Sequence, residues 1–236
     1  MITGKVTNGT TGRPVPNQTV QLMVPRNGMQ EVATAKTDAA GRFALSPPAD
    51  GSAPFFLVQT VFQAVNYRVR ISGDAAADLM VYDASRVPPP LRIKSARILI
   101  SAESQKIHVQ ELFAVENAAQ PARTFANSDG TFLFHLGEGA GDPTAAVAGP
   151  MNMPIPQAVQ DGKSPREFSI NFALQPGLTV VMVAYDADYS ARESPTPHYS
   201  AGSTKTPATS TGPGTGETCP STWPTDPATP NSSATR

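Results

Sequence analysis

The sequence predicts an all-β protein with two β-sandwiches in series and a disordered C-terminal tail. Apolar and polar residues alternate with a period of two along many short segments, whereas the period of an amphipathic helix is nearly absent. Clusters of Gly, Pro, Asn and Asp separate these segments at short intervals, as in sandwiches. The chain has 236 residues, which is enough for two cores of about 100 residues each.

The first sandwich is expected over residues 1–87. Val20, Leu22 and Val24 share one face of the segment VQLMV, and Phe43 and Leu45 share one face of RFALS. The other strands expected in this half are residues 2–6, 31–36, 55–62, 66–71 and 78–83.

Three consecutive prolines at 88–90 mark the predicted boundary, because prolines cannot sit in a central strand and favour a stiff linker. A second sandwich follows over residues 88–190. In the segment TFLFHL, Phe132, Phe134 and Leu136 face one way and His135 the other. The segment 178–185 is apolar on both faces and is expected to be a central strand. Further strands are expected at 96–101, 106–117 and 167–174.

Ser, Thr, Pro and Gly dominate residues 191–236, where few apolar residues remain. Such a segment buries too little apolar surface to offset its ordering entropy, so disorder is expected. Two origins fit the abrupt change in composition. The tail is either a Ser/Thr/Pro stalk or the product of a shifted reading frame.

The segment TDAAGRF (37–43) carries an Asp, a Gly and a Phe in fixed spacing. Asp38 can accept hydrogen bonds from backbone N–H groups two residues on, and Gly41 can adopt positive φ. Phe43 then re-enters the core. We interpret the segment as the turn of a hairpin between residues 31–36 and 43–45, because no partner for metal or acid–base chemistry lies beside Asp38 in the sequence.

Together with the segment GKVTNGTTGRPVPNQTVQLMV (4–24), this turn resembles the carboxypeptidase regulatory-like family over residues 2 to 86. The matching positions are Gly4, Val6, Gly12, Pro14, Val15, Pro16, Val20, Leu22, Thr37, Asp38, Gly41 and Phe43. The resemblance implies a seven-stranded sandwich similar to transthyretin, of immunoglobulin-like type, that serves as a noncatalytic accessory module. The zinc ligands and glutamate base of the metallocarboxypeptidases have no counterpart here. The second half looks like a domain of bacterial envelope proteins that follows such a module.

Composition excludes several classes of function. Net charge is −1 and only 16% of residues are charged, so no basic field exists to bind nucleic acid. The longest apolar run, 178–185, is too short for a membrane helix, and no signal peptide is visible. From the resemblance we expect a periplasmic or extracellular protein, with a membrane anchor in the full-length gene product. The single cysteine, Cys219, cannot form an intramolecular disulfide.

The sequence predicts no catalytic, cofactor-binding or metal-binding residue. The histidines His108, His135 and His198 lack metal-binding spacing. Asp186 and Asp188 share a face of an extended strand, but two carboxylates are too few for Ca²⁺. Gly137, Gly139 and Gly141 precede a proline-containing loop and not a helix, so we expect a hairpin loop and no phosphate cradle. No nucleophile elbow is present.

Some residues are typical of binding surfaces. Met151, Met153 and Ile155 lie in the segment MNMPIPQ and form either an adaptable contact surface or a loop folded onto the sandwich. Tyr67, Tyr82 and Tyr185 could stack on sugars, although strand tyrosines are usually packing residues. Asn8 and Asn17 lie in the pattern of glycosylation acceptors, which matters only in a eukaryotic secretory setting.

We therefore expect a noncatalytic binding or structural module of a bacterial cell-envelope protein that contacts protein or glycan. The alternatives are an accessory domain of a larger enzyme and a carbohydrate-binding module.

Overall fold

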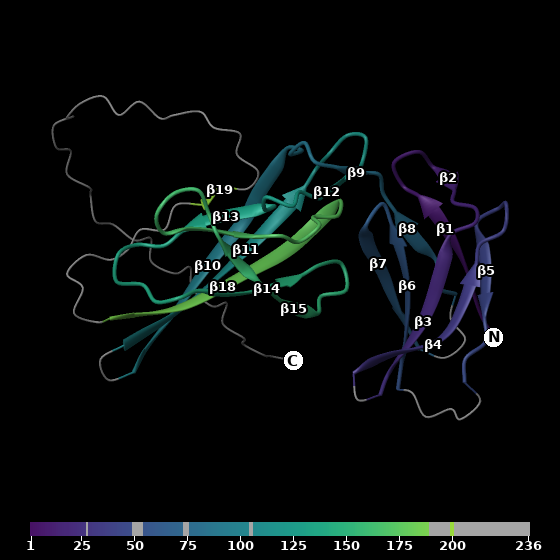
Figure 1. Ribbon diagram of the computed structural model, residues 1–236, viewed down its shortest axis with the longest axis horizontal. Helices are drawn as coiled ribbons and strands as arrows, with labels where there is room; N and C mark the ends of the chain where they lie inside the picture. The colour runs from purple at the N-terminus through teal and green to yellow at the C-terminus, as the bar shows by residue number, and fades with distance from the viewer. Residues whose placement is uncertain (27, 49–53, 73–75, 104–105, 189–198, 201–236) are drawn as a thin grey trace, which may run out of the picture. The chain divides into compact units, whose positions relative to one another are not determined.

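The structure, a computed structural model, describes residues 1–26, 28–48, 54–72, 76–103, 106–188 and 199–200. These residues form strands and turns without any helix, which confirms the all-β prediction (Figure 1). All of the described strands lie in one compact unit. Since no helix occurs in these ranges, none is available there to cross a bilayer.

Two four-stranded sheets surround the first hydrophobic core (Figure 1). One has the order β4-β3-β6-β7, with bounds Met29–Lys36, Thr19–Pro25, Phe56–Phe62 and Val65–Ile71. In the other, β1 pairs with β2, β5 and β8, with bounds Ile2–Asn8, Arg13–Pro14, Arg42–Leu45 and Leu79–Val81. Val20, Leu22 and Val24 of β3 are fully buried, as the alternation predicts. Val20 and Leu22 share the first core with Phe43 and Leu45 of β5.

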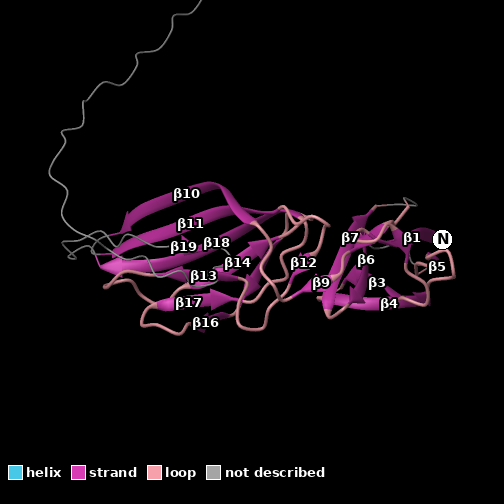
Figure 2. Cartoon of the chain, turned by 90° about the horizontal axis from the view of Figure 1, so that it is seen from above, coloured by secondary structure: helices cyan, strands magenta, loops and turns pink. Residues whose placement is uncertain are grey.

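The second core lies between a five-stranded and a four-stranded sheet. The first has the order β10-β11-β18-β14-β15, with bounds Leu91–Glu103, Lys106–Asn117, Gly177–Asp188, Thr144–Ala148 and Pro154–Gln157. The second has the order β16-β17-β13-β19, with bounds Val159–Asp161, Glu167–Ile170, Phe132–His135 and Tyr199–Ser200. Figure 2 shows β10, β11 and β18 in one layer and β16 and β17 in another.

Side-chain alternation in this half also follows the prediction. Phe132, Phe134 and Leu136 are buried and His135 is half-buried on the other face. β18 is the central strand of its sheet, as its apolar faces predict. β14, β15 and β16 are strands that the alternation does not reveal. β19 lies within the segment whose composition predicts disorder, and the rest of residues 191–236 lies outside the described residues.

The segment TDAAGRF forms the predicted turn. Asp38 Oδ1 accepts hydrogen bonds from the backbone N–H groups of Ala40 and Arg42, each at 2.8 Å, and Gly41 has φ +74°. The expected hairpin is wrong, however, because β4 and β5 belong to different sheets. The turn is a crossing from one sheet to the other over the first core.

The crossing fits against the turn RPVP (13–16). Thr37 Oγ1 donates to Val15 O at 2.7 Å and accepts from Gln18 N at 2.8 Å. A Cβ on Gly41 would stand 2.5 Å from Val6 O and 3.1 Å from Pro14 Cβ. Two segments that are separate in the sequence therefore meet in space, and Gly41 is the point of closest approach.

Hydrogen bonds cross the predicted boundary near residue 87. β9 (Ala84–Ser85) pairs in parallel with β12 (Thr124–Phe125). The hydroxyl of Tyr67 donates to Tyr82 O at 2.9 Å and lies 2.8 Å from Thr124 Oγ1. The division of the chain into separate domains at this point remains a prediction.

Replacement of Gly41 by Ala tests the close approach. The substitution places a Cβ at positive φ and 2.5 Å from Val6 O, so we expect a loss of about 3 kcal/mol or more in the free energy of unfolding, measured in urea. Gly12→Ala is the matched control, because Gly12 has φ +71° with nothing within 4 Å, and it should cost about 1 kcal/mol. Equal losses of unfolding free energy in the two variants would show that the close contact with Val6 does not contribute to the cost.

Candidate functional site

A cavity of about 370 Å³ is the strongest candidate site in the described part of the chain. Four parts of the chain line it: the turn after β6 with the start of β7, Ala126 after β12, the β14–β15 loop with β15 itself, and the stretch that follows β17. Its volume lies within the range of small-ligand sites. The lining residues are Ala64, Val65, Asn66, Arg68, Ala126, Gly149, Pro150, Met151, Met153, Ile155, Gln157, Asn171, Phe172, Ala173 and Gln175.

The β6–β7 hairpin supplies polar groups to the cavity. Gln63 and Ala64 have φ +48° and +62°, as in a two-residue turn that matches the twist of the strands. Side chains alternate from that turn onward, so Tyr67 is buried in the first core while Asn66 and Arg68 face away from it. The turn therefore fixes which residues of β7 point toward the cavity, and these are Asn66 and Arg68.

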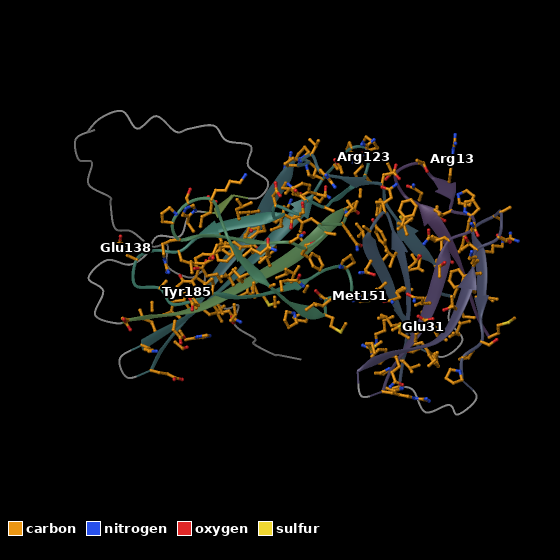
Figure 3. All side chains as sticks on the ribbon, in the orientation of Figure 1. Arg13, Glu31, Arg123, Glu138, Met151 and Tyr185 are labelled. Carbon is orange, nitrogen blue, oxygen red and sulfur yellow. The ribbon has the colours of Figure 1, made fainter. Side chains whose placement is uncertain are left out.

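The β14–β15 connection supplies apolar groups to the cavity. Asn152 has φ +57° and its N–H donates to Gly149 O at 2.9 Å, which closes a tight loop. Met151 is half-buried and Met153 is 49% exposed, and Figure 3 shows Met151 on this loop. The expected loop covers only the first part of the segment MNMPIPQ, because residues 154–157 form β15, which pairs with β14. Met151 and Met153 lie in the loop, and Ile155 lies in the strand.

The polar side chains around the cavity are only partly engaged. Gln59 Oε1 accepts a hydrogen bond from Arg68 Nε at 3.2 Å. Gln175 Nε2 donates to Asn66 O at 3.2 Å. Within the described ranges the other guanidinium N–H groups of Arg68 form no hydrogen bond or ion pair, so they can donate to an acceptor such as a carboxylate or carbonyl oxygen.

The histidines and aspartates singled out in the sequence lie elsewhere. His108 Nδ1 is 2.9 Å from Asp186 Oδ1, and both side chains are more than half exposed. Asp188 lies opposite Lys106 in the β11–β18 ladder. His198 and Cys219 are outside the described residues. No three potential metal ligands gather anywhere in the described ranges.

The tyrosines do not form a sugar-stacking surface. Tyr67 is 1% and Tyr185 is 4% exposed, so their rings cannot face a ligand. Tyr82 is half-buried, and its hydroxyl donates to Met80 Sδ at 3.1 Å. Of the two glycosylation-pattern residues, Asn8 is buried and its amide nitrogen donates to Asp83 Oδ1 at 2.8 Å, whereas Asn17 is exposed.

The glycine-containing segment 136–143 is not the expected hairpin loop. β13 and β14 belong to different sheets, so the segment crosses between the layers of the second core. Arg166 Nη2 donates to Gly137 O at 3.2 Å and to Ala140 O at 2.5 Å, which holds the crossing closed. Gly139 in this segment has φ +84°, a conformation that glycine adopts readily.

Alternation alone does not reveal the buried carboxylate of Glu111. This side chain is 0% exposed on the core face of β11, opposite Ile98 of β10. Tyr185 donates a hydrogen bond to Glu111 Oε1 at 2.8 Å, while Oε2 has no hydrogen-bond partner among the residues that the structure describes. Burial raises the pKa of Glu111, and the hydrogen bond from Tyr185 only partly opposes that shift. Because solvent cannot reach it, we assign this carboxyl group a structural role.

Substitution of Glu111 by Gln should change how stability depends on pH. Between the ordinary pKa of Glu and the raised pKa in the folded state, the folded protein binds more protons than the unfolded chain. The free energy of unfolding therefore falls as pH rises through that window and stays lowered above it. Glu111→Gln should remove this fall, measured by urea unfolding from about pH 4 to about pH 8. A constant difference between wild type and variant across that range would contradict the assignment.

A scan against models of known protein families finds no match to this chain, and no curated protein matches it.

Proposed function

We propose that this chain is a noncatalytic binding module of a bacterial cell-envelope protein, periplasmic or extracellular, and that its cavity holds an extended segment of another envelope protein. The observation that carries the proposal is the lining of the cavity. Soft apolar groups of Met151, Met153 and Phe172 line it together with amide groups and the guanidinium of Arg68. The resemblance of residues 2–86 to the carboxypeptidase regulatory-like family supports the accessory role and the envelope location.

The chemistry of the lining favours a peptide. Asn66, Gln157, Asn171 and Gln175 each carry both a donor and an acceptor, which is what an extended backbone requires of its surroundings. Methionine side chains adapt to ligand side chains of varied shape. A glycan could use the same amides, but sugars commonly pack on aromatic faces, and Phe172 is the single aromatic residue among those that line the described cavity.

Methionine methyl signals offer a direct readout. The full chain, labelled at its methionine methyl groups, is titrated with short synthetic peptides of alternating apolar and polar residues. We expect the Met151 and Met153 signals to shift while the signal of Met29, on β4, stays in place. The combined substitution of Met151 and Met153 by Asp should weaken binding at least tenfold, because it places charge in the apolar wall. Met29→Asp, at a methionine 44% exposed, is the matched control.

Two results would overturn parts of this proposal. Shifts with soluble polysaccharide and none with peptides would replace the peptide by a glycan as the ligand. Hydrolysis of peptide or glycosidic bonds by the chain alone would contradict the noncatalytic role.

Arg68→Gln tests the guanidinium. If Arg68 binds an acceptor on the ligand, the substitution should lower affinity for a peptide with a free C-terminal carboxylate about tenfold, since it removes a charged hydrogen bond. Affinity for the same peptide with an amidated C-terminus should change little, as measured by fluorescence anisotropy. An equal loss for both peptides would mean that Arg68 acts on the shape of the cavity and not on the carboxylate.

A further inference from the structure

The edge strand β10 is unusual for its exposure. It spans Leu91–Glu103 and pairs only with β11 among the described strands, so its outer side carries unpaired backbone N–H and C=O groups. Ile98, Leu99 and Ile100 are 54%, 52% and 66% exposed. Figure 2 shows the strand at the margin of its sheet. A long apolar edge is a template for pairing with another strand.

Other edges of these sheets carry features that oppose pairing. β15, at the opposite edge of the same sheet, contains Pro154 and Pro156, which have no N–H to donate. β7 presents Arg68 and Arg70 along its length, and β16 has only three residues. β10 has a bulge beside Lys94, but its ladder with β11 is regular from Ser95 to Glu103. The regular part of β10 contains no proline and is longer than β16, so it lacks the protection that β15 and β16 have.

The side chains of that regular part fall on two faces. Ile98 and Ile100 lie opposite Glu111 and Val109 of β11, so they share the core face of the sheet. Arg97 and Glu103 lie on the other face, because side chains alternate along a strand. Neither charge forms an ion pair with another described residue, and they stand at the two ends of the exposed apolar segment.

We propose that this edge pairs with the same edge of a second copy of the chain, antiparallel and around a two-fold axis at Ile100. In that register Ile100 meets Ile100 of the second copy, and Ile98 lies opposite Ala102. Arg97 lies opposite Glu103, and the symmetry forms this pair twice, as an isologous interface requires. The opposite charges at the two ends of the segment select the antiparallel register and the second copy as partner.

The pairing joins two five-stranded sheets into one continuous sheet. It satisfies backbone groups of β10, and it brings Ile98 and Ile100 of both copies together beside the buried Glu111. The contact is a strand edge and is therefore smaller than a standard interface. We expect a reversible dimer with a dissociation constant in the micromolar range.

Charge exchange tests the register. Sedimentation equilibrium of the full chain should show a monomer–dimer equilibrium. Arg97→Glu or Glu103→Arg alone places like charges opposite each other at two positions and should raise the dissociation constant about tenfold. The double variant restores both opposite-charge pairs and should return to the wild-type value. A monomeric wild type, or a double variant no better than the single ones, overturns the proposal.

Cross-linking tests the axis independently. In a Cys219→Ser background, Ile100→Cys should form a disulfide-linked dimer on mild oxidation, because the two residues face each other across the axis. Val61→Cys, at a residue 49% exposed on β6, is the control and should stay monomeric. Equal cross-linking at both positions would show random collision and would also overturn the proposal. This inference does not depend on what the cavity binds.

Discussion

A β-strand offers a core only every second side chain, so a sheet without helices can bury its apolar face only against another sheet. The chain must therefore cross between layers, and backbone groups at each crossing need partners outside the ladders. At the first core, the carboxylate of Asp38 accepts hydrogen bonds from two such N–H groups, and Gly41 allows the backbone to pass close to the carbonyl oxygen of Val6. At the second core, Arg166 binds the carbonyls of Gly137 and Ala140. Both cores depend on these crossings.

Strand alternation predicts the cores well and the connections poorly. Val20, Phe43, Phe132 and Phe134 are where the period of two places them, because that period is a property of the strand itself. The turn at Asp38 is equally local and was predictable, but its role as a crossing depends on which sheet each neighbouring strand joins. β14 and β15 escape prediction because alanines and prolines carry little alternation, and their pairing depends on the distant β18.

The cavity could be anticipated only in part. Met151, Met153 and Ile155 form a recognisable apolar segment between prolines, so the sequence indicates a contact surface there. Arg68 and Phe172 carry no such signal, since they reach the cavity through a turn of positive φ and through residues that follow the end of β17. The burial of Glu111 could not be predicted from the sequence for a related reason. In the sequence it resembles any solvent-facing charge of a strand, and its burial follows from the strands on either side of it.

The position of β11 between β10 and β18 has a consequence for folding. β10 and β11 are consecutive strands and can pair early, because only a short loop must close. The other edge of β11 can pair only when β18 is available, and Tyr185 of β18 lies 74 positions after Glu111 in the sequence. Contacts between such distant residues slow folding, and a chain that emerges from the ribosome exposes this hairpin until β18 follows. The apolar faces of β10 and β11 are both exposed to solvent during this interval, so the chain is most prone to aggregate at that stage.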